Sequence, residues 1–314
     1  MKIPVVKISK KKLRRIFEAF ILLLALSILI PQFLDLIRDK EVISSISVKY
    51  VLVATAVHIF TPIFAAASYI YLSPKPISFL KSIATQYASG FTNRLLPSGA
   101  GALATVTSFL SKSGLSIPES LSLALVNNIL GFFAFAIVML VLKAYDLNNI
   151  KSLAPDVHWY VYTGISVVLI ALVVAGITSK KLRTKIVRIF KEVSLALKQI
   201  TLHPISTLMA LMANAGITIL HIASLALCIA SVGYTLPIQI TALVFATGIV
   251  AITVSPTPSG LGLTELALSA SLKTFGLPTD QALVVAVSYR LVTYWIPILP
   301  GYIFYRLSRS KNII

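Results

Sequence analysis

The sequence predicts an all-α polytopic membrane protein in which residues 1–314 form a single transmembrane domain. The chain is 57% hydrophobic and only 12% charged, with a mean hydropathy of +0.90. A soluble domain cannot bury that much apolar surface. Several apolar runs exceed the ~18 residues that a spanning helix needs. Because these runs are continuous and do not alternate with polar residues, a membrane β-barrel is excluded.

Six apolar runs are uninterrupted. They cover about 16–37, 47–72, 117–142, 159–177, 204–232 and 279–307. The first follows a basic segment but lacks a small-residue cleavage site, so we expect a retained helix and not a signal peptide. Ser116 and Glu119 should form a capping box at the start of the third run.

Two further apolar regions are interrupted. Residues 77–112 contain Leu-Pro-Ser-Gly-Ala-Gly, and residues 237–275 contain Pro-Thr-Pro-Ser-Gly-Leu-Gly. Proline ends one helix and glycine permits a tight turn, so each region should form two short helices. The segments beside each break are about 15–20 residues long, which favours re-entrant hairpins over full crossings, although three full crossings would also fit.

The two interrupted regions mark an internal repeat. Pro97–Gly101 matches Pro258–Gly262, and further matches lie at nearly the same offset. We therefore predict repeat A at 13–143 and repeat B at 157–307, each with about three spanning helices and one hairpin. An odd number of crossings in each half gives the halves opposite orientations, which is an inverted-topology repeat.

The net charge of +18 lies mainly outside the apolar runs. One basic block precedes the first run. The other, at 179–203, has the apolar spacing of an amphipathic helix on the membrane surface. Neither block has interleaved aromatic residues, so positive-inside topology and anionic lipid explain them better than nucleic acid does. We expect a multi-pass protein of the cytoplasmic (cell) membrane with both termini in the cytoplasm.

The breaks are candidates for an anion site. The amides of Ser259, Gly260 and Leu261, like those of Ser98, Gly99 and Ala100, are expected to begin a helix with unpaired N–H groups. Such helix ends bind phosphate. The alternative is that these glycines only let helices pack closely. The glycines and serines assigned to binding are Ser98, Gly99, Gly101, Ser259, Gly260 and Gly262.

Ionisable residues inside the apolar regions are few. Burial of Arg94, Glu265 or Arg290 costs at least ~2.5–3.5 kcal/mol on insertion scales. One interpretation is a structural ion pair between Glu265 and Arg290. The other makes both arginines phosphate ligands and Glu265 a counter-charge or proton carrier, and the two can coexist. Three further polar residues are candidates for the same site. Tyr294 follows Arg290 by one helical turn, Asn93 is next to Arg94, and Asn128 occupies the repeat position equivalent to Arg290.

The sequence contains no recognisable catalytic or metal-binding motif. His58 and His221 lie at near-equivalent points of two apolar runs, where hydrogen-bonded packing is a more common role than proton relay or metal binding. We predict no metal, no cofactor and no enzymatic activity. Cys228 is the single cysteine, so no internal disulfide can form.

At Asn93–Leu115 and Ser255–Pro297 the sequence resembles the transmembrane family of lysylphosphatidylglycerol synthases, also called flippase-like or UPF0104 proteins. The second signature of that family is a proline–glycine turn, Gly-x-Gly, a glutamate and an arginine about 25 residues later. Pro258, Gly260, Gly262, Glu265 and Arg290 fill those places. The first motif has Ala104 where the second has Glu265. The resemblance implies a lipid-handling membrane protein, and bifunctional relatives carry a soluble synthase domain as well.

The sequence therefore leads us to expect a lipid translocase (flippase) for a phospholipid or a polyprenyl-phosphate-type lipid. The alternatives are a membrane-embedded lipid head-group transferase and a transporter of a small soluble anion. The expected partner is a membrane lipid: an anionic or aminoacylated phospholipid, or a polyprenyl phosphate. A lipid-modifying enzyme or glycosyltransferase as partner, a non-transport scaffold role and a homo-oligomer stay open.

Overall fold

The computed structural model describes residues 46–95, 99–145, 203–255 and 257–314. Every regular element in these ranges is a helix, which confirms the predicted all-α class. The expected runs at 16–37 and 159–177 lie outside the described residues. So does the amphipathic segment at 179–203, apart from its last residue.

The described helices follow one another along the chain in this order: α3 (Val48–Ile59), α4 (Thr61–Leu72), α5 (Phe79–Leu95), α6 (Ala100–Lys112), α7 (Ile117–Tyr145), α10 (Pro204–Ala230), α11 (Ile238–Val254), η3 (Pro258–Gly260), α12 (Leu263–Thr274), α13 (Thr279–Arg290), η4 (Leu291–Trp295) and α14 (Ile298–Ser310). Within the described residues, four helical stretches are long and apolar enough to cross a membrane. They are Val48–Leu72, Ile117–Ala144, Pro204–Ala230 and Thr279–Ser310, and they match four of the six predicted runs.

The chain forms two compact units, and both units draw on both predicted repeats. The described parts of the first unit are 46–60, 87–95, 99–105, 220–255 and 257–311. Those of the second are 61–86, 106–145, 203–219 and 312–314. The first unit therefore holds the Gly99–Gly101 end of the first motif together with the whole of the second motif.

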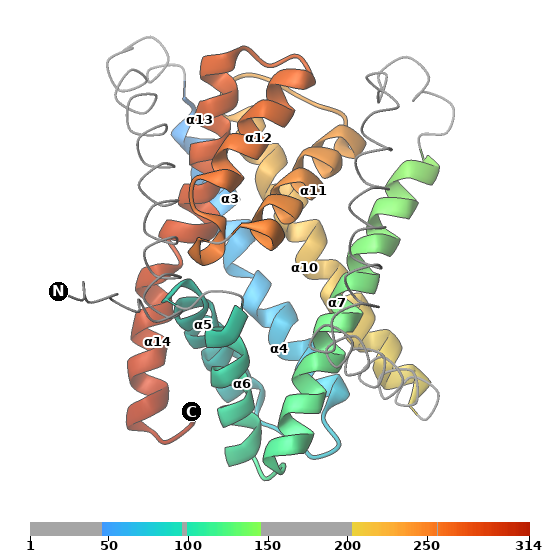
Figure 1. Ribbon diagram of the computed structural model, residues 1–314, viewed down its shortest axis with the longest axis vertical. Coiled ribbons are helices and arrows are strands. Elements are labelled where there is room, and N and C mark those ends of the chain that lie inside the picture. The colour runs from blue at the N-terminus through green and yellow to red at the C-terminus, as the bar shows by residue number, and fades with distance from the viewer. Residues whose placement is uncertain (1–45, 96–98, 146–202, 256) are drawn as a thin grey trace, which may run out of the picture. The chain divides into compact units, whose positions relative to one another are not determined.

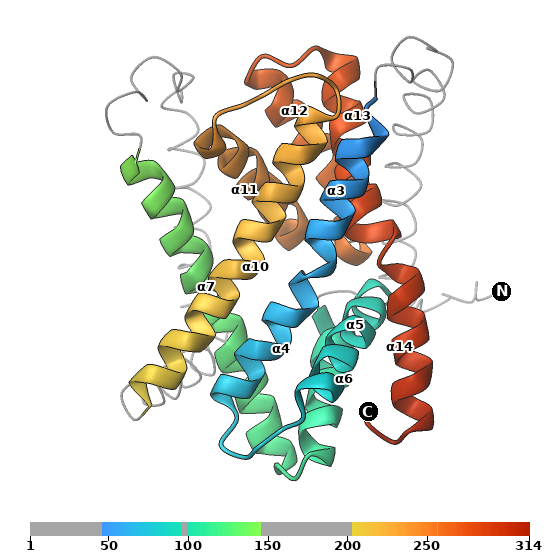
Figure 2. The same cartoon turned by 180° about the vertical axis from the view of Figure 1, so that it is seen from behind.

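In the first unit, α12 packs against both α11 and α13 (Figure 1). Leu268 of α12 is fully buried there, and a Cβ atom added to Gly248 of α11 would lie 3.0 Å from its Cδ2. The missing side chain of Gly248 lets the two helices approach. On another side of this unit, α3 packs against η4 (Figure 2).

The first unit also contains the meeting point of α5 and α6. A Cβ atom added to Gly101 would lie 2.0 Å from the carbonyl oxygen of Thr92. The hydroxyl oxygens of Thr92 and Thr105 are 2.8 Å apart, so the two helices are joined by a polar contact as well. Close packing of α5 against α6 therefore explains why residue 101 is a glycine.

In the second unit a polar contact joins the two long helices α7 and α10. Asn214 of α10 donates from Nδ2 to Oδ1 of Asn127 on α7 at 3.1 Å, and both residues are buried. The predicted capping box at the start of α7 is confirmed. The N–H of Ser116 donates to Glu119, and the N–H of Glu119 points back to the Ser116 hydroxyl.

We predict that Gly101→Ala destabilises the protein by about 1–3 kcal/mol, because the added methyl group overlaps the backbone of Thr92. The loss should appear as a lower unfolding temperature in detergent. Ala104→Ser is the matched control, since it also adds one heavy atom to α6 but at an exposed position. Equal unfolding temperatures for the two variants would contradict the tight contact between α5 and α6.

Candidate functional site

The break between α11 and α12 is a structured turn. Thr257 donates its hydroxyl to the carbonyl of Leu261 at 2.9 Å, which closes the turn on itself. Ser259 has φ 51°, a left-handed conformation that a residue with a side chain seldom adopts. Gly260 and Gly262 also have positive φ, so two of the three left-handed positions carry the residue that tolerates them.

The expectation that Ser259, Gly260 and Leu261 begin the second helix is wrong. The helix α12 begins at Leu263, with Gly262 as its cap. The N–H of Gly260 donates to the carbonyl of Thr257 at 3.2 Å, and that of Gly262 donates to the Glu265 carboxylate. The Gly260 amide, which was expected to be unpaired, is therefore paired within the turn, and the Gly262 amide is paired with Glu265 at the cap of α12. The helix starts later than predicted because Pro258–Gly260 forms a separate short helical turn.

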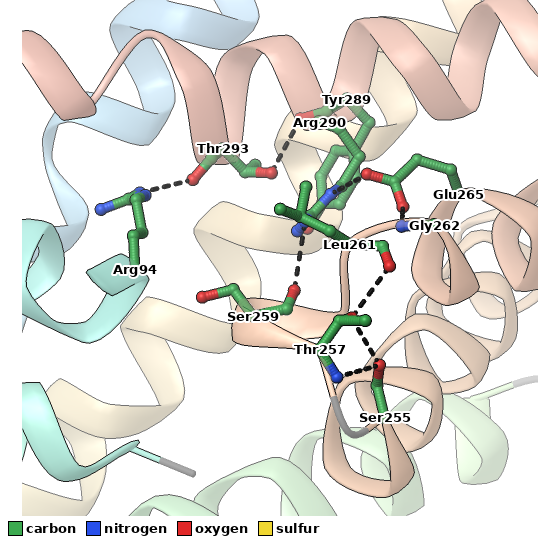
Figure 3. A network of polar contacts seen from close by, with 10 residues as sticks. All are labelled: Arg94, Ser255, Thr257, Ser259, Leu261, Gly262, Glu265, Tyr289, Arg290 and Thr293. Atoms are coloured by element: carbon green, nitrogen blue, oxygen red, sulfur yellow. Dashed lines mark hydrogen bonds and ion pairs between the residues drawn. The ribbon is translucent and has the colours of Figure 1, made fainter. Parts of the chain in front are cut away.

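Glu265 connects this turn to α13. Its Oε2 accepts the N–H of Gly262 at 2.8 Å, and its Oε1 accepts Nε of Arg290 at 2.7 Å (Figure 3). The side chains of Glu265 and Arg290 are 8% and 6% exposed, so this is a buried ion pair. The predicted structural pair is therefore present, and both carboxylate oxygens have a donor.

Arg290 also holds the turn directly. Its Nη2 donates to the carbonyl of Ser259 at 3.1 Å (Figure 3). Ser259 is the residue with the left-handed backbone. Its Cζ lies 4.6 Å from the ring centroid of Tyr294, a cation–π distance. Tyr294 therefore shares the face of Arg290, as the spacing predicted.

Arg94, near the end of α5, makes contact with the C-terminal helices. Its Nη2 donates to the carbonyl of Thr293 at 2.9 Å (Figure 3). Its Nη1 donates to the carbonyl of Gly90. In a regular helix the carbonyl of Thr293 would accept the N–H of residue 297. That residue is proline and has no N–H. Arg94 supplies the missing donor.

Thr293 belongs to η4, a π-helical turn that directly follows Arg290. Such turns are rare and occur often at functional sites. Here the turn presents Tyr294 to both arginines, since Cζ of Arg94 is 5.3 Å from the Tyr294 ring centroid. Three of the predicted binding residues, Arg94, Arg290 and Tyr294, therefore come together in the first unit.

These residues surround a cavity of about 220 Å³. That volume is well above the roughly 10–15 Å³ that one water molecule needs. The lining residues are Gly90, Asn93, Arg94, His221, Phe245, Gly248, Ile249, Ile252, Ser259, Thr264, Tyr289, Arg290, Thr293 and Tyr294.

Several polar atoms of the lining residues are buried and have no hydrogen-bond partner among the described residues. They are Oδ1 of Asn93, Nε of Arg94 and Oγ1 of Thr264. Buried polar atoms are normally paired. These three atoms have almost no accessible surface, so in this conformation they lie within the cavity wall and do not face the cavity itself. Arg94 brings a positive charge to this wall, and its two hydrogen bonds go to neutral carbonyls.

His221 forms the far wall of the same cavity. Its Nδ1 is 3.1 Å from the Tyr289 hydroxyl oxygen, and its ring stacks on Phe245. The ring of His58 lies 5.0 Å from that of His221 in an edge-on arrangement. These contacts fit the predicted packing role for both histidines. In the described ranges, no three His, Cys, Asp or Glu side chains are grouped as metal ligands.

The other predicted site residues have different positions. Gly99 directly precedes α6 and has φ +74°, and a Cβ atom added to it would lie 3.9 Å from Oδ1 of Asn93. Ser98 lies outside the described residues. Asn128 belongs to the second unit and its side chain is exposed on α7, whereas its buried neighbour Asn127 bonds to Asn214. Gly101 is buried in the contact between α5 and α6.

Sequence reasoning missed three polar lining residues, Thr264, Tyr289 and Thr293. Spacing offered a signal for two of them, since Thr293 lies one helical turn after Arg290 and Tyr289 directly precedes it. Thr264 lies next to Glu265 and gave no signal of its own.

The fold and the site define a multi-pass helical membrane protein with an arginine-lined cavity. The chain belongs to the family of the lysylphosphatidylglycerol synthase TM region, whose model matches residues 16–301. The family resemblance deduced from the two motifs is therefore confirmed. No curated protein matches the chain closely enough to name a relative.

We predict that Glu265→Gln lowers the free energy of unfolding by about 3–5 kcal/mol, because Arg290 is left buried without its counter-charge. The amide oxygen of Gln can still accept the N–H of Gly262, so the change isolates the charge. Adding Arg290→Gln should recover part of the loss, with a coupling of about 0.5–3 kcal/mol in a double-mutant cycle.

Chemical unfolding in detergent measures all four corners of this cycle. Glu119→Gln is the control, since Glu119 is exposed and bonds only within its own capping box. Strictly additive losses in the cycle would show that the ion pair contributes nothing to stability.

Proposed function

We propose that the protein is a lipid translocase that moves a phosphate-bearing lipid across the cytoplasmic membrane. The observation that carries this proposal is the cavity beside Arg94 and Arg290, which combines one half-buried and one buried arginine with an otherwise neutral, partly apolar lining. An intramembrane cationic residue that faces a cavity is typical of a substrate pathway. The phosphate would bind between the two arginines, and the acyl or prenyl chains would stay in the lipid.

The anion would be held mainly by side chains. Arg94 lines the cavity, and guanidinium groups form charge-assisted hydrogen bonds to phosphate oxygens. The amides of Gly260 and Gly262 are engaged in the turn, so the second helix end contributes little. Gly99, next to Asn93, is the position where backbone N–H groups of the first motif could assist.

In this proposal α5–α6 and α11–α12 are re-entrant hairpins in inverted repeats A and B. Their lengths support this, because these helices have 17, 13, 17 and 12 residues and a spanning helix needs about 20. Non-helical backbone at membrane depth also needs internal partners. The Glu265, Arg290 and Thr257 contacts would supply them at the second break.

Translocation would follow the mechanism of other inverted-repeat transporters, in which one half rocks against the other around a fixed site. The two basic blocks and both termini would lie in the cytoplasm. The protein itself would make and break no covalent bond. Association with a lipid-modifying enzyme or glycosyltransferase, and with a second copy of the chain, stays a prediction.

We predict that Arg94→Gln lowers the rate of lipid movement at least about tenfold, because the phosphate loses its uncompensated cation. The whole chain would be reconstituted into liposomes that contain a fluorescent phospholipid, and dithionite quenching of the outer leaflet would report movement. Arg309→Gln is the matched control, since Arg309 is exposed and its Cζ lies 5.9 Å from the Tyr305 ring, much as Arg94 lies over Tyr294.

Movement at the wild-type rate in a folded Arg94→Gln variant would overturn the assignment. The same liposomes separate the alternatives. A lipid of altered mass would indicate a head-group transferase. Uptake of radiolabelled inorganic phosphate without lipid movement would indicate a transporter of a soluble anion.

A further inference from the structure

We infer that residues 291–297, between α13 and α14, are a hinge that closes the cavity when an anion binds between Arg94 and Arg290. This inference rests on the proposed function, because the anion is the phosphate of the lipid. It comes from the way in which the two walls of the cavity are fastened to opposite ends of one interrupted helix.

The long helical stretch Thr279–Ser310 is interrupted directly after Arg290. The N–H of Ile296 donates to the carbonyl of Leu291 at 2.9 Å, which is the i+5 bond of a π-helical turn. Pro297 follows with no N–H to donate, and α14 begins at the next residue. Helices bend sharply at prolines and at π-helical turns. The junction can therefore change its angle without breaking the regular bonds of α13 or α14.

One wall of the cavity is fastened to α14. A Cβ atom added to Gly301 would lie 2.9 Å from Cβ of Phe91 and 2.9 Å from the carbonyl oxygen of Tyr87, so α14 is in close contact with the last part of α5 (Figure 1). The Tyr87 ring also stacks on that of Phe304, with centroids 5.0 Å apart. The cavity residues on this part of α5 are Gly90, Asn93 and Arg94. These residues therefore follow α14 when the hinge angle changes.

The opposite wall is fastened to α13. The ion pair of Glu265 with Arg290 joins α12 to α13, and α12 also packs against both α11 and α13. Arg290 holds the turn before α12 as well, through the carbonyl of Ser259. The polar cavity residues of this group are Ser259, Thr264, Tyr289 and Arg290. They therefore follow α13 when the hinge angle changes.

Arginines from both walls contact the hinge itself. Nη2 of Arg94 donates to the carbonyl of Thr293 at 2.9 Å, inside the π-helical turn. The Cζ atoms of Arg94 and Arg290 lie 5.3 Å and 4.6 Å from the ring centroid of Tyr294, which belongs to the same turn. The guanidinium groups of the two walls therefore meet at the hinge.

The charges of the two arginines give the direction of the movement. Two positive groups repel each other, whereas an anion between them attracts both. A phosphate can also accept hydrogen bonds from both guanidinium groups at once. Binding of the anion should therefore draw α5 and α14 toward α12 and α13, which narrows the cavity and bends the chain more sharply at 291–297.

The test measures the hinge with two spin labels in the full chain. Cys228→Ala removes the single cysteine. Lys273→Cys in α12 and Ser310→Cys in α14 place the labels at exposed positions on the two sides of the hinge. Double electron–electron resonance gives the distance between the labels, and native mass spectrometry of the same samples counts bound lipid.

The probes separate the phosphate from the lipid chains. The protein in neutral detergent receives an equimolar mixture of dioctanoyl phosphatidic acid, phosphatidylglycerol and phosphatidylethanolamine. Dioctanoylglycerol has the same chains without the phosphate. Inorganic phosphate at the same concentration has the charge without the apolar chains, whose burial adds to the binding energy.

We expect the phospholipid mixture to shorten the distance by at least about 2 Å, the size of a small helix shift in other switching proteins. Dioctanoylglycerol and inorganic phosphate should leave it unchanged. Arg94→Gln should abolish the shortening, because the wall on α5 loses its cation. Pro297→Ala should reduce it, because Ala supplies an N–H that can bond to the Thr293 carbonyl and stiffen the junction. Pro300→Ala is the matched control, since Pro300 lies inside α14, beyond the hinge.

Bound phospholipid without a change in distance would overturn the hinge while leaving lipid translocation intact. So would a full shortening with dioctanoylglycerol, in Arg94→Gln or in Pro297→Ala. The absence of bound phospholipid, or an equal shortening with inorganic phosphate, would overturn the proposed lipid function itself. The two failures are therefore distinguishable.

Discussion

The site depends on the two interactions that the Glu265 carboxylate makes with Gly262 and Arg290. The carboxylate joins three parts of the chain that proline and glycine would otherwise leave loose: the turn after α11, the first residues of α12 and the end of α13. Without it the Gly262 N–H and the Arg290 guanidinium would be buried without a charged partner. That state is more costly than any single packing defect nearby. Ser259 can keep its left-handed backbone because Arg290 also bonds to its carbonyl.

The pairing of Glu265 with Arg290 makes Arg94 distinctive. An arginine in an apolar region must have hydrogen-bond partners. Arg94 donates to the carbonyl of Gly90 in its own helix and to the carbonyl of Thr293, which Pro297 leaves without a backbone donor. These bonds position the guanidinium group but do not neutralise it. A cavity lined by two arginines, next to a π-helical turn, is suited to an anion.

The sequence predicted much of this and missed the rest for identifiable reasons. Apolar run lengths predicted the helices at 48–72, 117–144, 204–230 and 279–310, because burial in lipid depends on composition. The cost of buried charge predicted the pair of Glu265 with Arg290. The helix start at Leu263 was missed, since closure of the turn through Thr257 and Leu261 depends on side-chain geometry that spacing does not reveal. The position equivalent to Arg290 in the first half, Asn128, is exposed on α7, so a repeat in sequence does not imply the same environment.

The most direct measurement is a cryo-electron microscopy structure of the whole chain in nanodiscs of a phosphate-bearing lipid. The account predicts density for a two-tailed lipid whose phosphate oxygens lie about 2.7–2.9 Å from the guanidinium nitrogens of Arg94. An Arg94 side chain that is instead paired with a carboxylate of the protein, in a cavity closed to lipid, would contradict it.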